Sequence, residues 1–320
     1  MPFTSEQYET AKRLAEILMP YAVARQESFV QRNGRFVHYT SAESALKIIN
    51  SKSMWMRNTK CMSDFSEIMH GFQTLNNHEQ TKALITAFNT LPDVGPTGVN
   101  LFNTWWNDTQ YQTFITSISE HDEGEDDHGR LSMWRAFARA SARVGLVFKI
   151  PLTPSFAESL NLVISPVAYF THEQLGSELA TVIANVNRTI DYLRSADRDL
   201  VVGSIFQMLV LATACLKHQG FHEEREWRVI YWPKRRPSDL MASSVEVVDG
   251  VPQIVYKIPL SGGPPPDLAG LAIPQLVDRV IIGPSPYPWP MYEAFTAALA
   301  GAGVKDAGAR VFVSGIPIRT

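Results

Sequence analysis

The stretch FVHYTSAESALKIINSKSMW, residues 36–55, combines strand-like and helix-like patterns and raises the first question about function. It opens like a strand, continues with apolar residues at helical spacing after Ser41, a suitable N-cap, and closes on a second strand-like run, SMWMR. The polar triplet His38, Tyr39 and Thr40 lies in the opening strand, beside apolar residues. A buried imidazole or phenol without a hydrogen-bond partner costs a few kcal/mol. We therefore expect either the fold or a ligand to satisfy these groups.

The composition is ordinary for a globular protein of enzyme size. The 320 residues favour one large or two modest domains, and the net charge of -3 gives no overall attraction to nucleic acid or to anionic membranes. Cys61 and Cys215 are the only cysteines and stand far apart, so neither a disulfide framework nor a structural zinc site is indicated. The first residues lack the pattern of a secretory signal, and the apolar stretch 201–216 is short for a membrane span. We expect a cytoplasmic protein without a membrane partner.

The hydrophobic patterns predict an α+β fold with a single mixed sheet and helical insertions. We expect an N-terminal helical segment over 1–30 and a main domain over 31–320, with a helical insertion around 173–220. The Pro- and Gly-rich segment LPDVGPTGVN, residues 91–100, is predicted to be a loop. Helices are predicted over 4–24, 42–50, 67–89, from 131, twice within 173–219, and over 291–302; strands are predicted in RFVHYTS, SMWMR, YQTFITSISE, GLVFKI, EEREWRVIYW, DRVIIG and ARVFVSG.

Several common enzyme motifs are absent, including the phosphate-binding loop, the dinucleotide-binding GxGxxG, HExxH and GxSxG. The polar run HDEGEDDHGR, residues 121–130, could hold a divalent cation through its carboxylates. A contiguous acidic run is more often a solvated loop, and we expect a loop here and no bound metal. The basic KRR at 234–236 is a weak signal for phosphate contact.

The stretch EEREWRVI, residues 223–230, is the second chemically informative segment. As a strand it would place Glu224, Glu226 and Arg228 on one face. Two neighbouring carboxylates repel each other when buried, so such a pair needs a cation, a hydroxyl-rich ligand or an arginine. A functional carboxylate pair and a structural ion pair with Arg228 at a sheet edge both remain open.

A third segment places Trp134 beside Arg135 on a predicted helix. This pair could stack on a planar ring or hold an anionic phosphate. Trp134 could equally belong to the core, as most aromatic residues on a helix face do.

Taken in order, these motifs resemble a widespread bacterial family of uncharacterised proteins, known as a domain of unknown function. The resemblance covers residues 36–319 and rests on HYT, MSDFSE, SISE followed by a tryptophan and GLVF, EREWR, IIGP and SGIPIR. The chain departs from the family at Ser63-Asp64, where Asn-Asp is common. The family plan is similar in turn to that of the ADP-ribosyltransferase superfamily, which consumes NAD.

That similarity implies a site split between an early and a late strand. It implies that His38 holds the NAD ribose and that Thr40 lies next to the adenosine or the nicotinamide amide. It also implies that Glu226 is the catalytic carboxylate, with Glu224 as second candidate. The other implied positions are the candidates for stacking, Tyr39, Trp55 and Trp134, and those for binding the pyrophosphate, Arg57, Arg135 and Arg228.

The resemblance implies NAD as the substrate, and a protein, a nucleic acid or water as the acceptor, with bacterial conflict or phage defence as the context. A carboxylate that hydrogen-bonds the ribose hydroxyls would stabilise the oxocarbenium character of the transition state. Two alternatives stay open. One is a non-catalytic nucleotide- or partner-binding domain; the other is a metal-dependent nuclease that uses Asp64, Glu67 and the acidic run 120–128.

Overall fold

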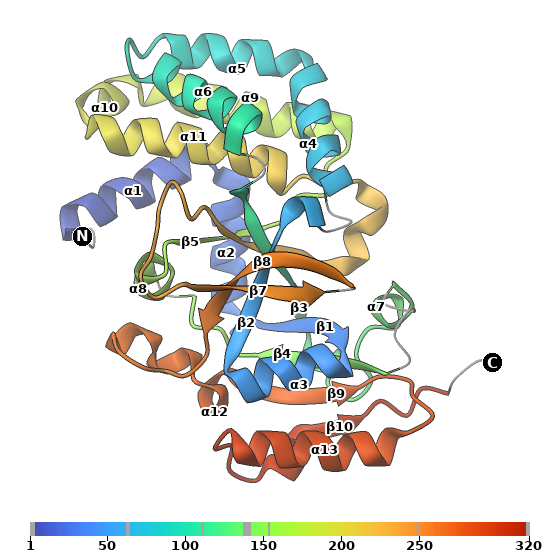
Figure 1. The fold of residues 1–320 in the computed structure, drawn as a ribbon. Helices are drawn as coiled ribbons and strands as arrows, with labels where there is room; N and C mark the ends of the chain where they lie inside the picture. Colours follow the sequence, from blue (N-terminus) through green and yellow to red (C-terminus); the bar gives the residue numbers. More distant parts are fainter. Residues whose placement is uncertain are drawn as a thin grey trace. The chain divides into compact units, whose positions relative to one another are not determined.

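The computed structural model describes residues 4–61, 65–109, 112–136, 142–152, 154–248 and 250–317 (Figure 1). Contacts divide the chain into two compact units. The first unit combines residues 1–29, 59–113 and 165–222, and the second combines 30–58, 114–164 and 223–320. The expected mixture of helices with a single open mixed sheet is confirmed. The N-terminal helices and those of 165–222, which we expected as separate additions, fall into one unit with residues 59–113.

The first unit is helical. Its central helix is α11 (Arg198–Ala214), which packs against α1, α4 and α6 and is largely buried from Val201 onwards. A helix that is apolar all round is typical of a protein interior, so the prediction of a buried helix over 201–216 is confirmed. None of the described helices is long and apolar enough to cross a membrane. The remaining elements are α1 (Ser5–Leu18), α2 (Pro20–Gln31, of which 20–29 belong here), η1 (Thr59–Cys61), α4 (Phe65–Asn77), α5 (Glu79–Asn89), α6 (Gly95–Thr104), η2 (Trp105–Thr109), α9 (His172–Arg188) and α10 (Ile190–Ser195).

Two predicted helices are each interrupted by one residue. The helix predicted over 4–24 breaks before Pro20, which lacks the N–H that would continue the hydrogen-bond ladder. The helix predicted over 67–89 breaks at His78, the N-cap of α5, whose side chain accepts the backbone N–H of Gln80.

The predicted loop over 91–100 is wrong in its second half, where α6 begins. Pro96 lies in the first turn of α6, a position at which its missing N–H costs no hydrogen bond. Gly98 allows α6 to approach α11 closely, because a Cβ at this position would lie 2.8 Å from a side-chain carbon of Ile205. The glycine and proline that suggest a loop therefore serve a closely packed helix.

The second unit is built on the sheet, whose strand order is β10-β9-β4-β1-β3-β2-β8-β7, with β6 pairing with β3 and β5. The β9–β10 ladder is parallel, and the other described registers are antiparallel. Each predicted strand has a counterpart in the structure, although the one predicted from Glu223 begins only at Glu226, and β5 and the β7–β8 hairpin are absent from the sequence-based prediction. The strands are β1 (Arg35–Ser41), β2 (Ser53–Asn58), β3 (Phe114–His121), β4 (Arg143–Phe148), β5 (Leu162–Pro166), β6 (Glu226–Tyr231), β7 (Ala242–Val248), β8 (Val251–Pro259), β9 (Val277–Ile282) and β10 (Val311–Val313).

Helix α3 (Ala42–Ser51) connects β1 to β2, and its predicted cap is confirmed, since the Ser41 side chain accepts the N–H of Ser44. It contacts β1, β4 and α13 (Pro288–Gly301), and α13 lies along β9 and β10 (Figure 1). The shorter helices of this unit are η4 (Glu123–Glu125), α7 (Leu131–Ala136), α8 (Pro154–Ser159), η6 (Pro266–Leu271), α12 (Ile273–Leu276) and η7 (Ala307–Arg310), and η5 (Gln219–Glu224) ends in it.

Replacing Gly71 with alanine should destabilise the first unit. A Cβ at Gly71 of α4 would lie 2.1 Å from the backbone oxygen of Thr213 in α11, and relieving such overpacking costs about 1–3 kcal/mol. Gly203→Ala, in α11 itself, is the matched control, because its added Cβ would meet nothing within 4 Å. The control should be neutral or slightly stabilising, since alanine favours helices over glycine. Denaturant unfolding measures both variants, and equal stabilities would contradict the close α4–α11 packing.

Candidate functional site

His38 and Glu226, the two residues expected to carry the chemistry, are both held by Ser117 of the central strand β3. The Ser117 carbonyl oxygen lies 2.9 Å from Nδ1 of His38, and the Ser117 hydroxyl donates to Oε1 of Glu226 at 2.6 Å. A carbonyl can only accept, so the His38 proton resides on Nδ1 and Nε2 of the neutral ring is an acceptor.

The strand register places the side chains of His38 and Glu226 on opposite faces of the sheet. Val37 pairs with Ser119, and Ser119 pairs with Glu226, so these three side chains share one face. His38 follows Val37 in an unbroken ladder with β4 and therefore points to the other face. The two residues do not face each other across a common site, as the split-site hypothesis expects; they are linked through Ser117.

The β1–β3 ladder ends just before His38. It covers Arg35–Val37, whereas the β1–β4 ladder runs from Phe36 to Ser41. On the same side of β3, pairing with β2 begins only at Ile115, so residues 116–118 have no partner strand there among the described strands. His38 hydrogen-bonds Ser117 within this interruption, and Thr40 shares its face two residues further on.

His38 is half-buried, and its withdrawal from solvent lowers its pKa below the ordinary 6.5, an effect opposed by the hydrogen bond to Ser117. The ring is therefore neutral at pH 7. Thr40 is also half-buried. The His38 ring and the Thr40 hydroxyl therefore lie on one face of β1, next to residues 116–118 of β3.

Glu226 is buried and engaged by protein groups. Its Oε1 accepts from Nε of Arg228 at 2.8 Å in addition to Ser117, and Nη2 of Arg228 lies 3.4 Å from Oε2. Arg228 is completely buried. The structural ion pair considered from the sequence is thus present, although it lies inside the sheet, because β6 pairs with both β3 and β5.

Glu224 does not share a strand face with Glu226, so that part of the prediction is wrong. Strand β6 starts at Glu226, and Glu224 is the last residue of η5. Between them, Arg225 has φ +44°, a left-handed conformation that turns the chain and breaks the alternation of side chains.

Two of the stacking candidates, Tyr39 and Trp134, belong to the core. Their rings meet edge to face with centroids 4.8 Å apart, and they are 4% and 1% exposed. The Tyr39 hydroxyl accepts the backbone N–H of Arg130, and the Trp134 indole donates to the carbonyl of His128. The core interpretation of Trp134 therefore holds in this structure, and neither ring offers a free face to a ligand.

The remaining candidates are more accessible but are not gathered around His38. Trp55 is half-buried with the ammonium of Lys257 5.4 Å from its ring centre, and Arg57 donates to Gln253. Register places Arg57 on the face of Glu226, since it pairs with Ile115 of β3. Arg135, at the end of α7, is exposed.

The acidic run 121–130 forms a loop with one short helix, η4, as predicted. Glu123 and Asp127 are exposed, as expected of a solvated loop, whereas Asp122, Glu125 and Asp126 pair with basic side chains. Arg130 binds both oxygens of Glu125, at 2.9 and 3.1 Å. The other pairs are Asp122 with Arg225 and Arg32, Glu125 with Arg225, and Asp126 with Arg35, Arg279 and His121. Three of the five carboxylates of this loop are therefore engaged by protein cations, which makes them less available to a metal ion.

The nuclease hypothesis loses support elsewhere too. Glu67 pairs with the buried Lys217 at 2.9 Å. Asp64 and Ser63 lie outside the described residues.

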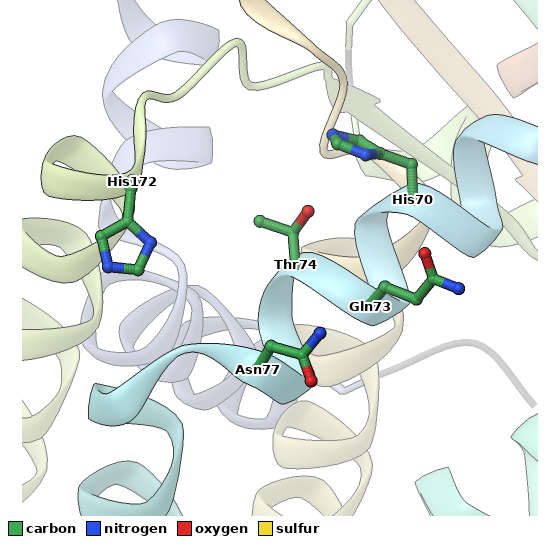
Figure 2. A pocket seen from close by; sticks show the side chains of 5 residues that line it. All are labelled: His70, Gln73, Thr74, Asn77 and His172. Atoms are coloured by element: carbon green, nitrogen blue, oxygen red, sulfur yellow. The ribbon is translucent and has the colours of Figure 1, made fainter.

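The first unit contains an open pocket of about 350 Å³, lined by His70, Gln73, Thr74, Asn77 and His172. Figure 2 shows the α4 side chains of this set and His172, at the start of α9, on opposite sides of the pocket. Its lining is polar, and none of the site residues expected from the sequence takes part.

His78, Glu79 and His172 form the one group in the described part of the chain that could offer three metal ligands within 4.8 Å of one another. Both ring nitrogens of His78 are already hydrogen-bonded within the protein, because Nδ1 accepts the N–H of Gln80 and Nε2 donates to the carbonyl of His172. The N-termini of α5 and α9 also lie here, and their dipoles repel cations. We assign no metal to this group.

Sequence reasoning missed Ser117 and Arg130 as the residues that organise this region. The available signal is the placement of Ser117 in SISE and of Arg130 at the end of the acidic run, since a lone arginine beside several acids is a natural ion-pair partner.

Comparison with models of protein families, with curated proteins and with solved structures finds no match to this chain.

Substituting Asp278 with asparagine should make stability less dependent on acidic pH. Burial would raise the pKa of Asp278, but hydrogen bonds from Lys149 and Arg35 outweigh it and lower the pKa from 3.8 to about 2. The carboxylate therefore contributes about 2 kcal/mol above pH 4, and this contribution disappears as the pH falls towards 2.

The measurement is the free energy of unfolding of wild type and Asp278→Asn between pH 7 and pH 2. The difference should be largest at neutral pH and vanish near pH 2. Asp191→Asn, at a side chain 97% exposed, is the control and should change little at any pH. A constant difference across the range would contradict the role given to Asp278.

Proposed function

We propose that this protein binds NAD where β1 and β3 separate, and that it acts as an ADP-ribosyltransferase-like enzyme. The observation that supports the proposal is the state of His38. Its tautomer is fixed by the Ser117 carbonyl, and its neutral ring has Nε2 available as an acceptor. A ribose hydroxyl is a donor that suits such a nitrogen.

The proposed chemistry is cleavage of the bond between nicotinamide and ribose. As the bond breaks, positive charge develops on the ribose, and a carboxylate near its hydroxyls stabilises that charge more than it stabilises the bound substrate. Glu226 is separated from His38 by Ser117, whose hydroxyl it now accepts. Because the two side chains point to opposite faces of the sheet, Glu226 can act on a ribose held by His38 only if it releases the Ser117 hydroxyl and reaches the other face, beside residues 116–118.

A second candidate function is a non-catalytic nucleotide-binding domain. The burial of Glu226 and its pairing with Arg228 favour this alternative, because a carboxylate that is already saturated contributes little to a transition state. The two functions share the role of His38 and differ in the role of Glu226, so two experiments separate them.

NAD binding should depend on His38. Calorimetry should show His38→Ala binding NAD about 3- to 10-fold more weakly, the range expected for one lost hydrogen bond. His222→Ala, at an exposed histidine, is the control and should bind like wild type. Because burial lowers the pKa of His38, affinity should change little between pH 8 and 7 and should fall in more acidic solution, where protonation removes the acceptor. Equal affinities for wild type and His38→Ala would remove the basis of the proposal.

Turnover should depend on Glu226. Purified protein is incubated with labelled NAD, with and without bacterial lysate, and nicotinamide release and labelled protein or nucleic acid are measured; these products also identify the acceptor. Glu226→Gln should lose at least about 100-fold in rate if the carboxylate acts in the transition state. Binding of NAD without any release of nicotinamide would establish the non-catalytic alternative.

Removing the charge of Glu226 takes one charged partner away from the buried Arg228, which can itself destabilise the protein. Ser117→Ala is therefore measured alongside, because it removes one hydrogen bond to Glu226 without changing any charge. Unfolding curves of both variants show whether a lost activity reflects lost chemistry or lost structure.

A further inference from the structure

We propose that two copies of this chain associate through strand β7, which pairs antiparallel with the β7 of the second copy about a twofold axis at Val245. This inference concerns the far edge of the sheet and does not depend on the proposed function. It rests on the exposed side chains of the β7–β8 hairpin, on the position of β7 in the sheet and on the symmetry of its sequence.

The hairpin carries apolar side chains in water. Val245 is 72% exposed, Val247 61% and Ile254 53%. Val245 pairs directly with Ile254 in the β7–β8 ladder, and Val247 lies two residues from Val245, so all three share one face. Neighbouring exposed apolar residues of this kind are typical of an interaction surface, whereas isolated ones are common.

Strand β7 is the end of the sheet path, and none of the described strands pairs with its outer side. Protein sheets usually protect such an edge with lysine, proline or a bulge. The sequence of β7, ASSVEVV, contains neither lysine nor proline. Its register with β8 is regular from Ala242 to Val248, so it has no bulge there. The edge is therefore open to another strand.

The one charge on β7 does not oppose pairing. Glu246 accepts from Nζ of Lys257 at 2.8 Å and from the hydroxyl of Ser244 at 2.8 Å. Its charge is compensated within the same hairpin, on the face opposite the valines.

A second copy of β7 fits this edge better than an arbitrary strand, because β7 is self-complementary. Val245 is the fourth of seven residues, so a twofold axis there pairs every residue of one strand with a residue of the other. Val245 then faces Val245 of the second copy, Ser243 faces Val247, and Ser244 faces Glu246, its present hydrogen-bond acceptor. The valines of the two copies would form one apolar strip.

The backbone also suits this register. The ladder with β8 continues to the pair Val248 and Val251, and residues that close so short a hairpin hydrogen-bond to each other. Hydrogen-bonded pairs alternate along an antiparallel ladder. The backbone groups that bond to β8 are therefore those of Ala242, Ser244, Glu246 and Val248. The N–H and C=O groups of Val245 point away from β8, towards the open edge. Two such residues meeting on a twofold axis form a hydrogen-bonded pair.

The test combines the mass in solution with a cross-link that only this symmetry allows. Sedimentation equilibrium of the full chain should show a monomer–dimer equilibrium in wild type, and Val245→Lys should weaken dimerisation at least tenfold. Because Val245 is exposed, this variant should fold normally, as circular dichroism checks. Trp289→Lys, at another large apolar side chain that is 68% exposed in the same unit, is the control and should dimerise like wild type.

The cross-link is made in a Cys61→Ser background, since Cys61 is exposed. Val245→Cys should give a disulfide-linked dimer on mild oxidation, because paired residues on the axis lie about 5.5 Å apart between Cα atoms. Val247→Cys should cross-link far less, because Val247 faces Ser243 of the second copy and the two Val247 residues lie four residue pairs apart along the ladder. A monomeric wild type at all concentrations, a dimer that survives Val245→Lys, or equal cross-linking at 245 and 247 would each overturn the proposal.

Discussion

The guanidinium of Arg130 is the contact on which the polar end of the second unit depends. It binds both carboxylate oxygens of Glu125 and donates to the backbone carbonyls of Glu120, Glu223 and Glu224. The backbone N–H of Arg130 donates to the Tyr39 hydroxyl. The acidic loop, the end of β3, the approach to β6 and strand β1 are thereby joined at one residue. A planar group with five donors can do this, and a lysine could not.

This arrangement determines what Glu226 can do. Because the backbone before β6 is held by Arg130 and turns at Arg225, the strand begins with Glu226 pointing to the face shared with Val37. Its carboxylate then meets Arg228 and Ser117. The side chain of His38, which is hydrogen-bonded to the carbonyl of the same Ser117, points to the other face. His38 and Glu226 can therefore act on one substrate only if their hydrogen bonds to Ser117 rearrange.

The sequence predicts the elements of this fold well where one residue decides a local conformation. Ser41 as a helix cap and the apolar helix over 201–216 are examples, because capping and burial around a whole helix follow from short-range patterns. The prediction fails where tertiary packing decides. Helix α6 starts in a segment with the composition of a loop, since Gly98 gains from close contact with α11. Glu224 lies outside the strand because Arg225 adopts a left-handed conformation, which no pattern in EEREWRVI predicts.

The residue types of the candidate site can be read from the sequence: a histidine and a threonine in the first strand, and a glutamate with an arginine two residues later in a late strand. Alternation along a strand also fixed that Glu226 and Arg228 share a face. Only the tertiary structure decided which strands are neighbours and in what register. A shift of the strand pairing by one residue moves every side chain to the other face of the sheet. The observed register therefore places His38 and Glu226 on opposite faces, with Ser117 between them.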